Sequence, residues 1–122
     1  MPSSDVSLAR LQPEAMAILD AAYVRACEVV DPELIALAQS RIDMILLGAP
    51  PDDRDLSERE ADIATVVDQM LIDVSGLDDA TTARAARHFD DGGFADFAMA
   101  EYIIEARTRL AIASGLLLGV ER

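Results

Sequence analysis

The clearest hydrophobic pattern in the chain lies between residues 57 and 76. Ser57 and Glu60 precede this pattern with the spacing of a capping box, in which each side chain bonds the backbone amide of the other residue. The apolar residues that follow recur at every third or fourth position, as on one face of a helix: Ile63, Val66, Val67, Met70, Leu71 and Val74. We predict an amphipathic helix that begins near Ser57 and ends near Ser75 and Gly76.

Helical spacing recurs on both sides of this segment. It predicts four further helices, over residues 13–30, 32–47, 79–89 and 94–118. Asp31 and Asp78 stand where N-cap residues are expected, and Pro32 occupies a first helical position, where proline is tolerated. Gly48 is placed to end the helix before it.

The last predicted helix is apolar on nearly every side. Its charged residues are Asp96, Glu101, Glu105, Arg107 and Arg109. A helix of this kind has to be buried all round, which is easier in a small domain if a second subunit covers one face. No segment has the pattern of a strand. We therefore predict an all-α domain of about five helices in a homo-oligomer, with the last helix in the core or in the subunit interface.

Length and charge narrow the possibilities further. The 122 residues suit one domain, which we place at 13–122 after a flexible segment 1–12. The net charge of −13 and the absence of lysine exclude a nucleic-acid partner and disfavour a membrane surface. The start has no leader pattern, and the longest uncharged apolar stretch, residues 110–120, is about half of a membrane span. We expect a cytoplasmic protein.

Two segments of the chain share a pattern with a known family. Residues 31–48 (DPELIALAQSRIDMILLG) and 56–110, which include LSEREADIATVV and RHFDD, resemble the carboxymuconolactone decarboxylase-like family. This family also contains the alkylhydroperoxidase D-like proteins. The resemblance covers about two thirds of the chain and implies the helical domain of that family. It also implies that a reactive Cys-x-x-Cys segment, followed by a histidine, should come after the first of these two segments.

The chain departs from the family at this position. Gly48 leads directly to Pro50 and Pro51, and residues 48–59 contain neither cysteine nor histidine. We interpret this loop as a short connection where the family carries its redox segment. Dithiol chemistry needs one thiolate to attack and a second thiol to resolve, so the lone Cys27 cannot replace the pair.

Three charged residues near the end of the chain are the strongest candidates for chemistry. Glu101, Glu105 and Arg109 are spaced four apart, so they share one helix face, and Glu105 precedes Arg109 in the favourable order for an ion pair. One interpretation is a structural ion-pair network. The other is a pocket in which Arg109 binds a carboxylate ligand and Glu101 or Glu105 moves a proton.

His88, Asp68, Asp73 and Cys27 are weaker candidates. His88 could be a general base, or it could interact with the dipole at the end of the fourth helix. Asp68 could transfer a proton, or it could lie at the edge of the core and pair with an arginine of the last helix. We predict that Asp73 is a solvated residue beside the apolar face of its helix, and that Cys27 is a small hydrophobic residue of the core.

These observations lead to three hypotheses. The first is cysteine-independent acid–base chemistry on a small organic acid or lactone, with Arg109 as the ligand-binding residue. The second is a non-catalytic helical module for binding or assembly. The third, redox function through an intermolecular disulfide of Cys27, is the weakest. One histidine and one cysteine without paired spacing do not form a zinc site, and we expect no metal and no cofactor.

Overall fold

The computed structural model describes residue 10 and residues 12–51 and 54–118. These residues form five α-helices and one short 3-10 helix: α2 (Pro13–Val29), α3 (Pro32–Leu46), α4 (Glu58–Ile72), η1 (Val74–Gly76), α5 (Asp79–Ala86) and α6 (Gly93–Leu118). No strand occurs within these ranges, so the all-α prediction is confirmed for them. The predicted flexible segment 1–12 lies outside the described residues, except for positions 10 and 12.

The helices begin at the residues whose side chains can cap them. The capping box at α4 is complete, because the Glu60 amide donates to Ser57 Oγ and the Ser57 amide donates to Glu60 Oε1, both at 3.1 Å. Asp31 and Asp78 each accept a hydrogen bond from a backbone amide in the first turn of α3 and α5. Just beyond the end of α3, Gly48 adopts a φ of +69°, a conformation that glycine allows without steric cost.

The end of α5 differs from the prediction. The helix stops at Ala86 rather than near residue 89, and the amides of His88 and Phe89 bond carbonyls three residues back in a tighter turn. Phe89 explains this change of direction, since its ring lies against the rings of Phe94 and Phe97, with centroids 5.6 and 5.7 Å apart. The chain therefore leaves the helix early and turns towards α6.

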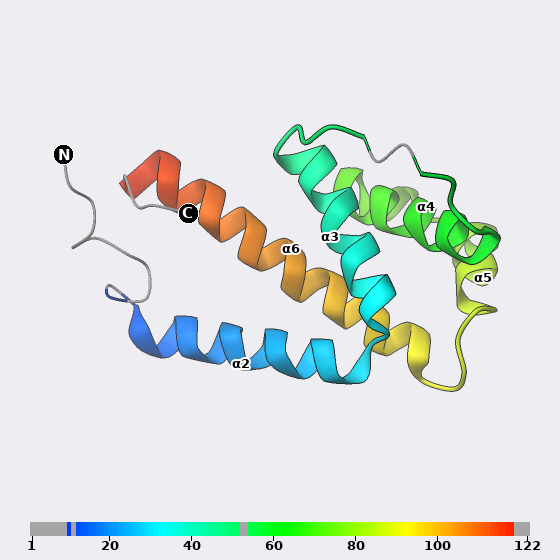
Figure 1. The fold of residues 1–122 in the computed structure, drawn as a ribbon, viewed down its shortest axis with the longest axis horizontal. Helices are drawn as coiled ribbons and strands as arrows, with labels where there is room; N and C mark the ends of the chain where they lie inside the picture. Colours follow the sequence, from blue (N-terminus) through cyan, green and yellow to red (C-terminus); the bar gives the residue numbers. More distant parts are fainter. Residues whose placement is uncertain (1–9, 11, 52–53, 119–122) are drawn as a thin grey trace.

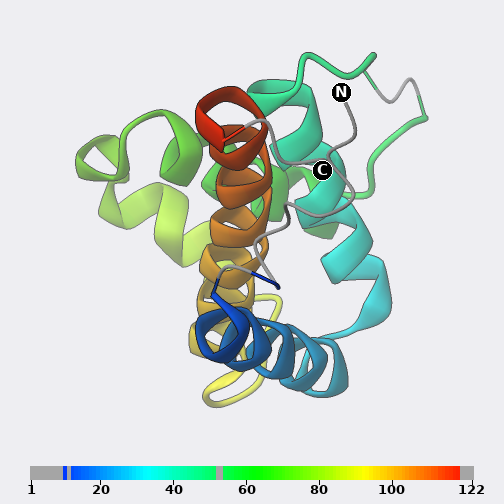
Figure 2. The same cartoon turned by 90° about the vertical axis from the view of Figure 1, so that its left-hand side faces the viewer.

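Helix α6 is the element around which the others are arranged. It packs against α2 and against α3, while α3 also packs against α4 and α4 against α5 (Figure 1). Figure 2, turned by 90°, shows α2 crossing below α6, with α3 on one side and α4 and α5 on the other. None of the helices in the described residues is both long enough and apolar enough to cross a membrane.

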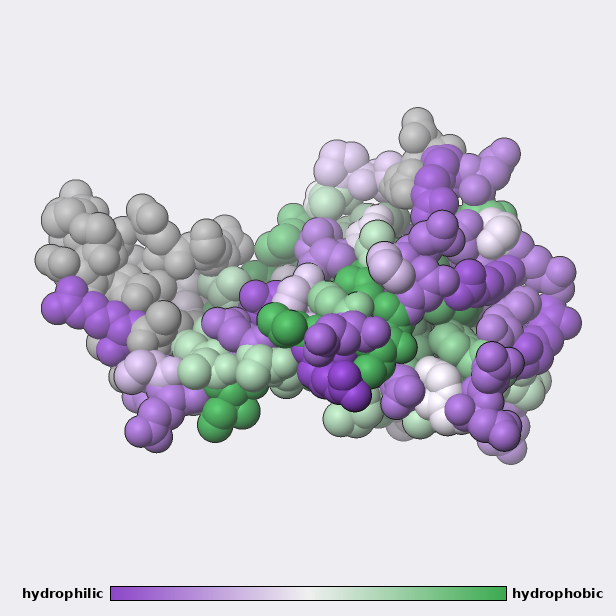
Figure 3. All heavy atoms as spheres, turned by 60° about the horizontal axis from the view of Figure 1, so that its bottom comes forward, coloured by the Kyte–Doolittle hydropathy of each residue, from purple (hydrophilic) through white to green (hydrophobic). Residues whose placement is uncertain are grey.

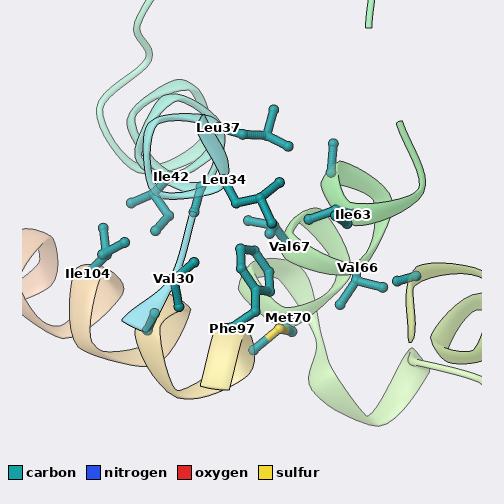
Figure 4. Packing of buried hydrophobic residues seen from close by; sticks show 14 of the residues in the cluster. Val30, Leu34, Leu37, Ile42, Ile63, Val66, Val67, Met70, Phe97 and Ile104 are labelled. Carbon is teal, nitrogen blue, oxygen red and sulfur yellow. The ribbon is translucent and has the colours of Figure 1, made fainter. Parts of the chain in front are cut away.

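The hydrophobic core lies where α3, α4 and α6 meet. Phe97 of α6 is fully buried at its centre, with Leu34 of α3 and Val67 and Met70 of α4 around it (Figure 4). Ile104, two turns further along α6, continues the buried face. This face sets the orientation of α6 and thereby places the charged residues that follow Phe97.

The opposite face of α6 is not covered within the described chain. Met99, Tyr102 and Leu110 lie at helical spacing along it, with 61%, 47% and 41% of their surface exposed. The described chain alone therefore does not bury α6 on all sides. The predicted oligomer, in which a second subunit would cover this face, stays a prediction.

Candidate functional site

Glu101 is the most unusual polar residue of the core. It lies one turn after Phe97 on α6, it is 0% exposed, and neither of its carboxyl oxygens has a hydrogen-bond partner among the described residues. Burial, which removes water from the ionised form, and the neighbouring Glu105 together raise the pKa of Glu101 to about 8. Glu101 therefore holds a proton at neutral pH.

Glu105 connects this buried acid to an arginine. Its Oε2 accepts a hydrogen bond from Arg109 Nε at 2.8 Å, as the four-residue spacing predicts, whereas its Oε1 is buried without a described partner. The protonated Glu101 can donate a hydrogen bond to Glu105, which is one reason for its raised pKa. Glu105 thus has one oxygen for the Glu101 proton and one for the guanidinium of Arg109.

A polar contact joins α3 to α6 at Thr108, three residues after Glu105. Gln39 Nε2 donates to Asp43 Oδ1 at 2.8 Å and to Thr108 Oγ1 at 3.3 Å, and Thr108 Oγ1 donates to the carbonyl of Ile104. None of these three side chains is among the candidates that the sequence pattern indicates. The spacing of seven residues from Glu101 to Thr108 is the signal that could have placed Thr108 on the same face of α6.

Arg109 opens onto a hollow in the surface. The hollow has a volume of about 490 Å³ and is lined by Leu46 of α3 and by Arg109, Ile112, Ala113 and Leu116 of α6. Among the described residues, Arg109 is the only charged one in this lining, and its side chain is half exposed, whereas that of Glu105 is 14% exposed. The site therefore combines an accessible cation, a buried proton-bearing acid and an apolar wall.

The structure does not bring His88 to this site. His88 lies two residues beyond the end of α5, and its Nε2 is 2.8 Å from Oδ2 of Asp62 on α4. The hydrogen bond with His88, together with Arg87 at 3.1 Å, holds the pKa of Asp62 below its ordinary value. The pair of His88 and Asp62 ties the end of α5 to α4, and the interaction of His88 with the dipole of α5 stays a prediction.

Asp68 also has a partner that differs from the expected one. Its carboxylate accepts two hydrogen bonds from Arg41 of α3, at 2.9 Å from Nε and 2.5 Å from Nη2. The expectation that an arginine of the last helix would pair with Asp68 is wrong. This bidentate pair joins α3 to α4, and the bond raises the pKa of Arg41.

Cys27 lies outside the buried core, although the sequence pattern predicted it as a core residue. Its side chain is partly buried, and its hydrogen bond with Tyr23 is the main cause that raises the pKa of the Tyr23 hydroxyl. Arg107 of α6 lies over the Tyr23 ring at 3.9 Å and pairs with Asp20 at 3.6 Å. This cluster joins α2 to α6. Asp73, predicted as a solvated flank, is exposed and caps η1.

The arginines of the loop region after α3 stabilise helix starts. Arg54 pairs with Glu60 at 2.9 Å, and Arg59, in the first turn of α4, pairs with Asp31 at 3.1 Å. Both acids lie at helix N-termini, where a carboxylate is favourable. Within the described residues, no group of three or more His, Cys, Asp or Glu side chains could hold a metal ion.

Comparison of the chain with protein-family models, with curated proteins and with solved structures finds no match in any of the three.

Proposed function

We propose that the chain binds a small organic acid or lactone beside Arg109 and exchanges a proton with it through the carboxyl pair of Glu101 and Glu105. One observation carries this proposal: the fully buried Glu101 carboxyl has no partner among the described residues other than the Glu105 carboxylate, which also binds Arg109. Buried polar groups are almost always hydrogen-bonded, and exceptions gather at functional sites.

The three residues take different roles in this proposal. Arg109 uses Nε to bind Glu105, so its two terminal nitrogens have no bonded partner among the described residues and remain for the two oxygens of a carboxylate. Glu105, between Arg109 and Glu101, is the group that accepts a proton from the ligand or returns one. Glu101 has no exposed surface, so it acts through Glu105 as a store for the proton.

The proposed assignment to the carboxymuconolactone decarboxylase-like family rests on the resemblance in residues 31–48 and 56–110. The chain would be a divergent member that works without the redox cysteine pair. The position of Cys27, in α2 beside Tyr23, supports the view that the acid–base chemistry does not use its thiol.

A non-catalytic assembly module is the second candidate. The exposed row of Met99, Tyr102 and Leu110 on α6 favours it, because contiguous apolar surface often marks a protein–protein contact. In this case the charged residues of α6 would only fix its packing, and the chain would form a homo-oligomer through the uncovered face.

A thermal-shift screen separates the two candidates. Small carboxylates, lactones and quinones are tested against the wild type, Arg109→Ala and the control Arg107→Ala, which changes an arginine of the same helix that stacks on Tyr23. A ligand at 100 times its dissociation constant adds about 2.7 kcal/mol to stability. We expect a carboxylate-dependent shift that disappears in Arg109→Ala but persists in Arg107→Ala. It should also persist in Cys27→Ser, a third variant tested in the same screen.

The opposite outcome is equally clear. If no compound shifts the wild type and Arg109→Ala is only less stable, the charges of α6 are structural. The assembly module is then the better description of the chain, and its oligomeric state becomes the next measurement.

A further inference from the structure

We infer that the ligand of this site is a monocarboxylate with an apolar body, and that the site discriminates against dicarboxylates. This inference deepens the proposed function and rests on ligand binding at Arg109. The lining of the hollow points to it, because one cation is combined with four aliphatic side chains, those of Leu46, Ile112, Ala113 and Leu116.

The arginine provides a place for one carboxylate only. Glu105 fixes the guanidinium through Nε at 2.8 Å, which leaves the end of the fork, with two terminal nitrogens, as the remaining donor edge. Two parallel N–H bonds to one carboxylate are the preferred geometry for this edge. A ligand held in this way has its carboxylate at Arg109 and the rest of its body over the apolar lining.

A second carboxylate on the ligand would meet unfavourable surroundings. Within the described part of the chain the lining has no second cation, and Glu105 lies directly beside Arg109. Asp43, one turn before Leu46 on α3, adds a further carboxylate on this side of the molecule. Like charges without a cationic partner repel each other, so we expect discrimination of at least about tenfold against a dicarboxylate of equal length.

The walls of the hollow favour an apolar body. Leu116 is 81% exposed, so a ligand that covers it removes apolar surface from water. The volume of about 490 Å³ lies within the range of pockets that bind small molecules. Each methylene that is fully buried strengthens binding by about fourfold, and a partly open wall gives somewhat less. Hydrophilic residues instead dominate the end of the molecule that carries α4 and α5, as Figure 3 shows for one face.

Calorimetric titration at pH 7 tests the inference directly. Hexanoate, octanoate and decanoate, kept below their micelle concentrations, are compared with suberate, the dicarboxylate that matches octanoate in carbon number. We expect octanoate to bind at least about tenfold more tightly than suberate, with a gain of two- to fourfold for each added methylene.

Two variants and a matched control locate the binding. Arg109→Gln should weaken the binding of octanoate by tenfold or more. Leu116→Asn, at an exposed position that tolerates a polar side chain, should reduce the gain in affinity per methylene. Arg107→Gln changes an arginine on the α2 side of the same helix. It should leave the octanoate affinity and the gain per methylene within twofold of the wild-type values.

The outcomes distinguish the two claims. Suberate that binds as tightly as octanoate, or an affinity that does not change with chain length, overturns the inference while ligand binding at Arg109 stands. Equal losses of octanoate affinity in Arg107→Gln and Arg109→Gln also overturn the inference, because they would reflect a general effect on α6. If no acid or lactone binds to the wild type, the proposed function fails together with the inference.

Discussion

Replacing Glu101 by glutamine should make the protein more stable at alkaline pH. The glutamine amide has nearly the same shape as a protonated carboxyl group and can still donate a hydrogen bond to Glu105, but it cannot ionise. Wild-type Glu101 is fully buried, and its pKa is raised to about 8 from an ordinary value of 4.5. The unfolded chain therefore releases this proton at a lower pH than the folded protein does.

The sign and the size of the effect on stability follow from the difference between the pKa values of Glu101 in the folded and unfolded states. Below pH 4.5 the carboxyl group is protonated in both states, and its contribution to the stability of the wild type is fully present. Between pH 4.5 and about 8 the unfolded state has lost the proton and the folded state has kept it, so stability falls by about 1.4 kcal/mol per pH unit. Over the whole interval this amounts to roughly 5 kcal/mol, and above about pH 8 the loss levels off.

Urea unfolding at a series of pH values from 4 to 9 measures the effect. The quantity of interest is the free energy of unfolding of Glu101→Gln minus that of the wild type, since ionisable groups that do not interact with Glu101 cancel in this difference. We expect it to rise steadily with pH and to reach several kcal/mol in favour of the variant at pH 9. A typical domain has only 5–15 kcal/mol in total, so the effect is large.

The control is Glu28→Gln, which removes the same charge from an exposed position on α2. Its free energy of unfolding should remain close to that of the wild type over the whole pH series. A difference for Glu101→Gln that is flat between pH 5 and 8 would refute the reasoning, because it would mean that Glu101 is ionised and stabilised in the folded protein by a contact that the structure does not show.

Four further predictions concern stability and ligand binding. Asp68→Asn should cost about 1–3 kcal/mol in urea unfolding, because the partly buried Arg41 loses its charged partner; unchanged stability would show that the pair is fully solvated. Ser57→Ala should cost about 1 kcal/mol through loss of the capping box, and it should do so without affecting ligand binding. Phe97→Ala should cost about 3–5 kcal/mol by leaving a cavity in the core, and a smaller loss would indicate that the core collapses. Any carboxylate that binds at Arg109 should bind more weakly above pH 8 in titrations, because Glu101 then adds a negative charge; an affinity independent of pH would separate Glu101 from the ligand.

The starts of the helices could be predicted from the sequence because capping is local. Ser57 and Glu60 are three residues apart, and the hydrogen bonds between them need no other part of the chain. The end of α5 could not be predicted in the same way. It depends on the contact of Phe89 with Phe94 and Phe97, which belong to the next helix.

In the candidate site, too, contacts within one helix could be predicted and contacts between helices could not. The pair of Glu105 and Arg109 follows from a spacing of four residues within one helix. The partners of Asp68 and His88 lie on other helices, 27 and 26 residues away in the sequence, and helical periodicity contains no information about them. The full burial of Glu101 was likewise not predictable from its spacing, because Glu105, on the same face, keeps part of its side chain exposed.

The position of Glu101 argues for a role other than stability. The ion pair of Glu105 and Arg109 is complete without it, and the carboxyl group of Glu101 has no hydrogen-bond partner among the described residues other than Glu105. An aliphatic or amide side chain at this position would avoid the free energy that its ionisation costs the folded protein. Residues that lower stability and are nevertheless present are expected at functional sites. A Glu101→Gln variant that is more stable at pH 8 and yet loses turnover of a ligand that it still binds would show this trade-off and assign the proton of Glu101 to the reaction.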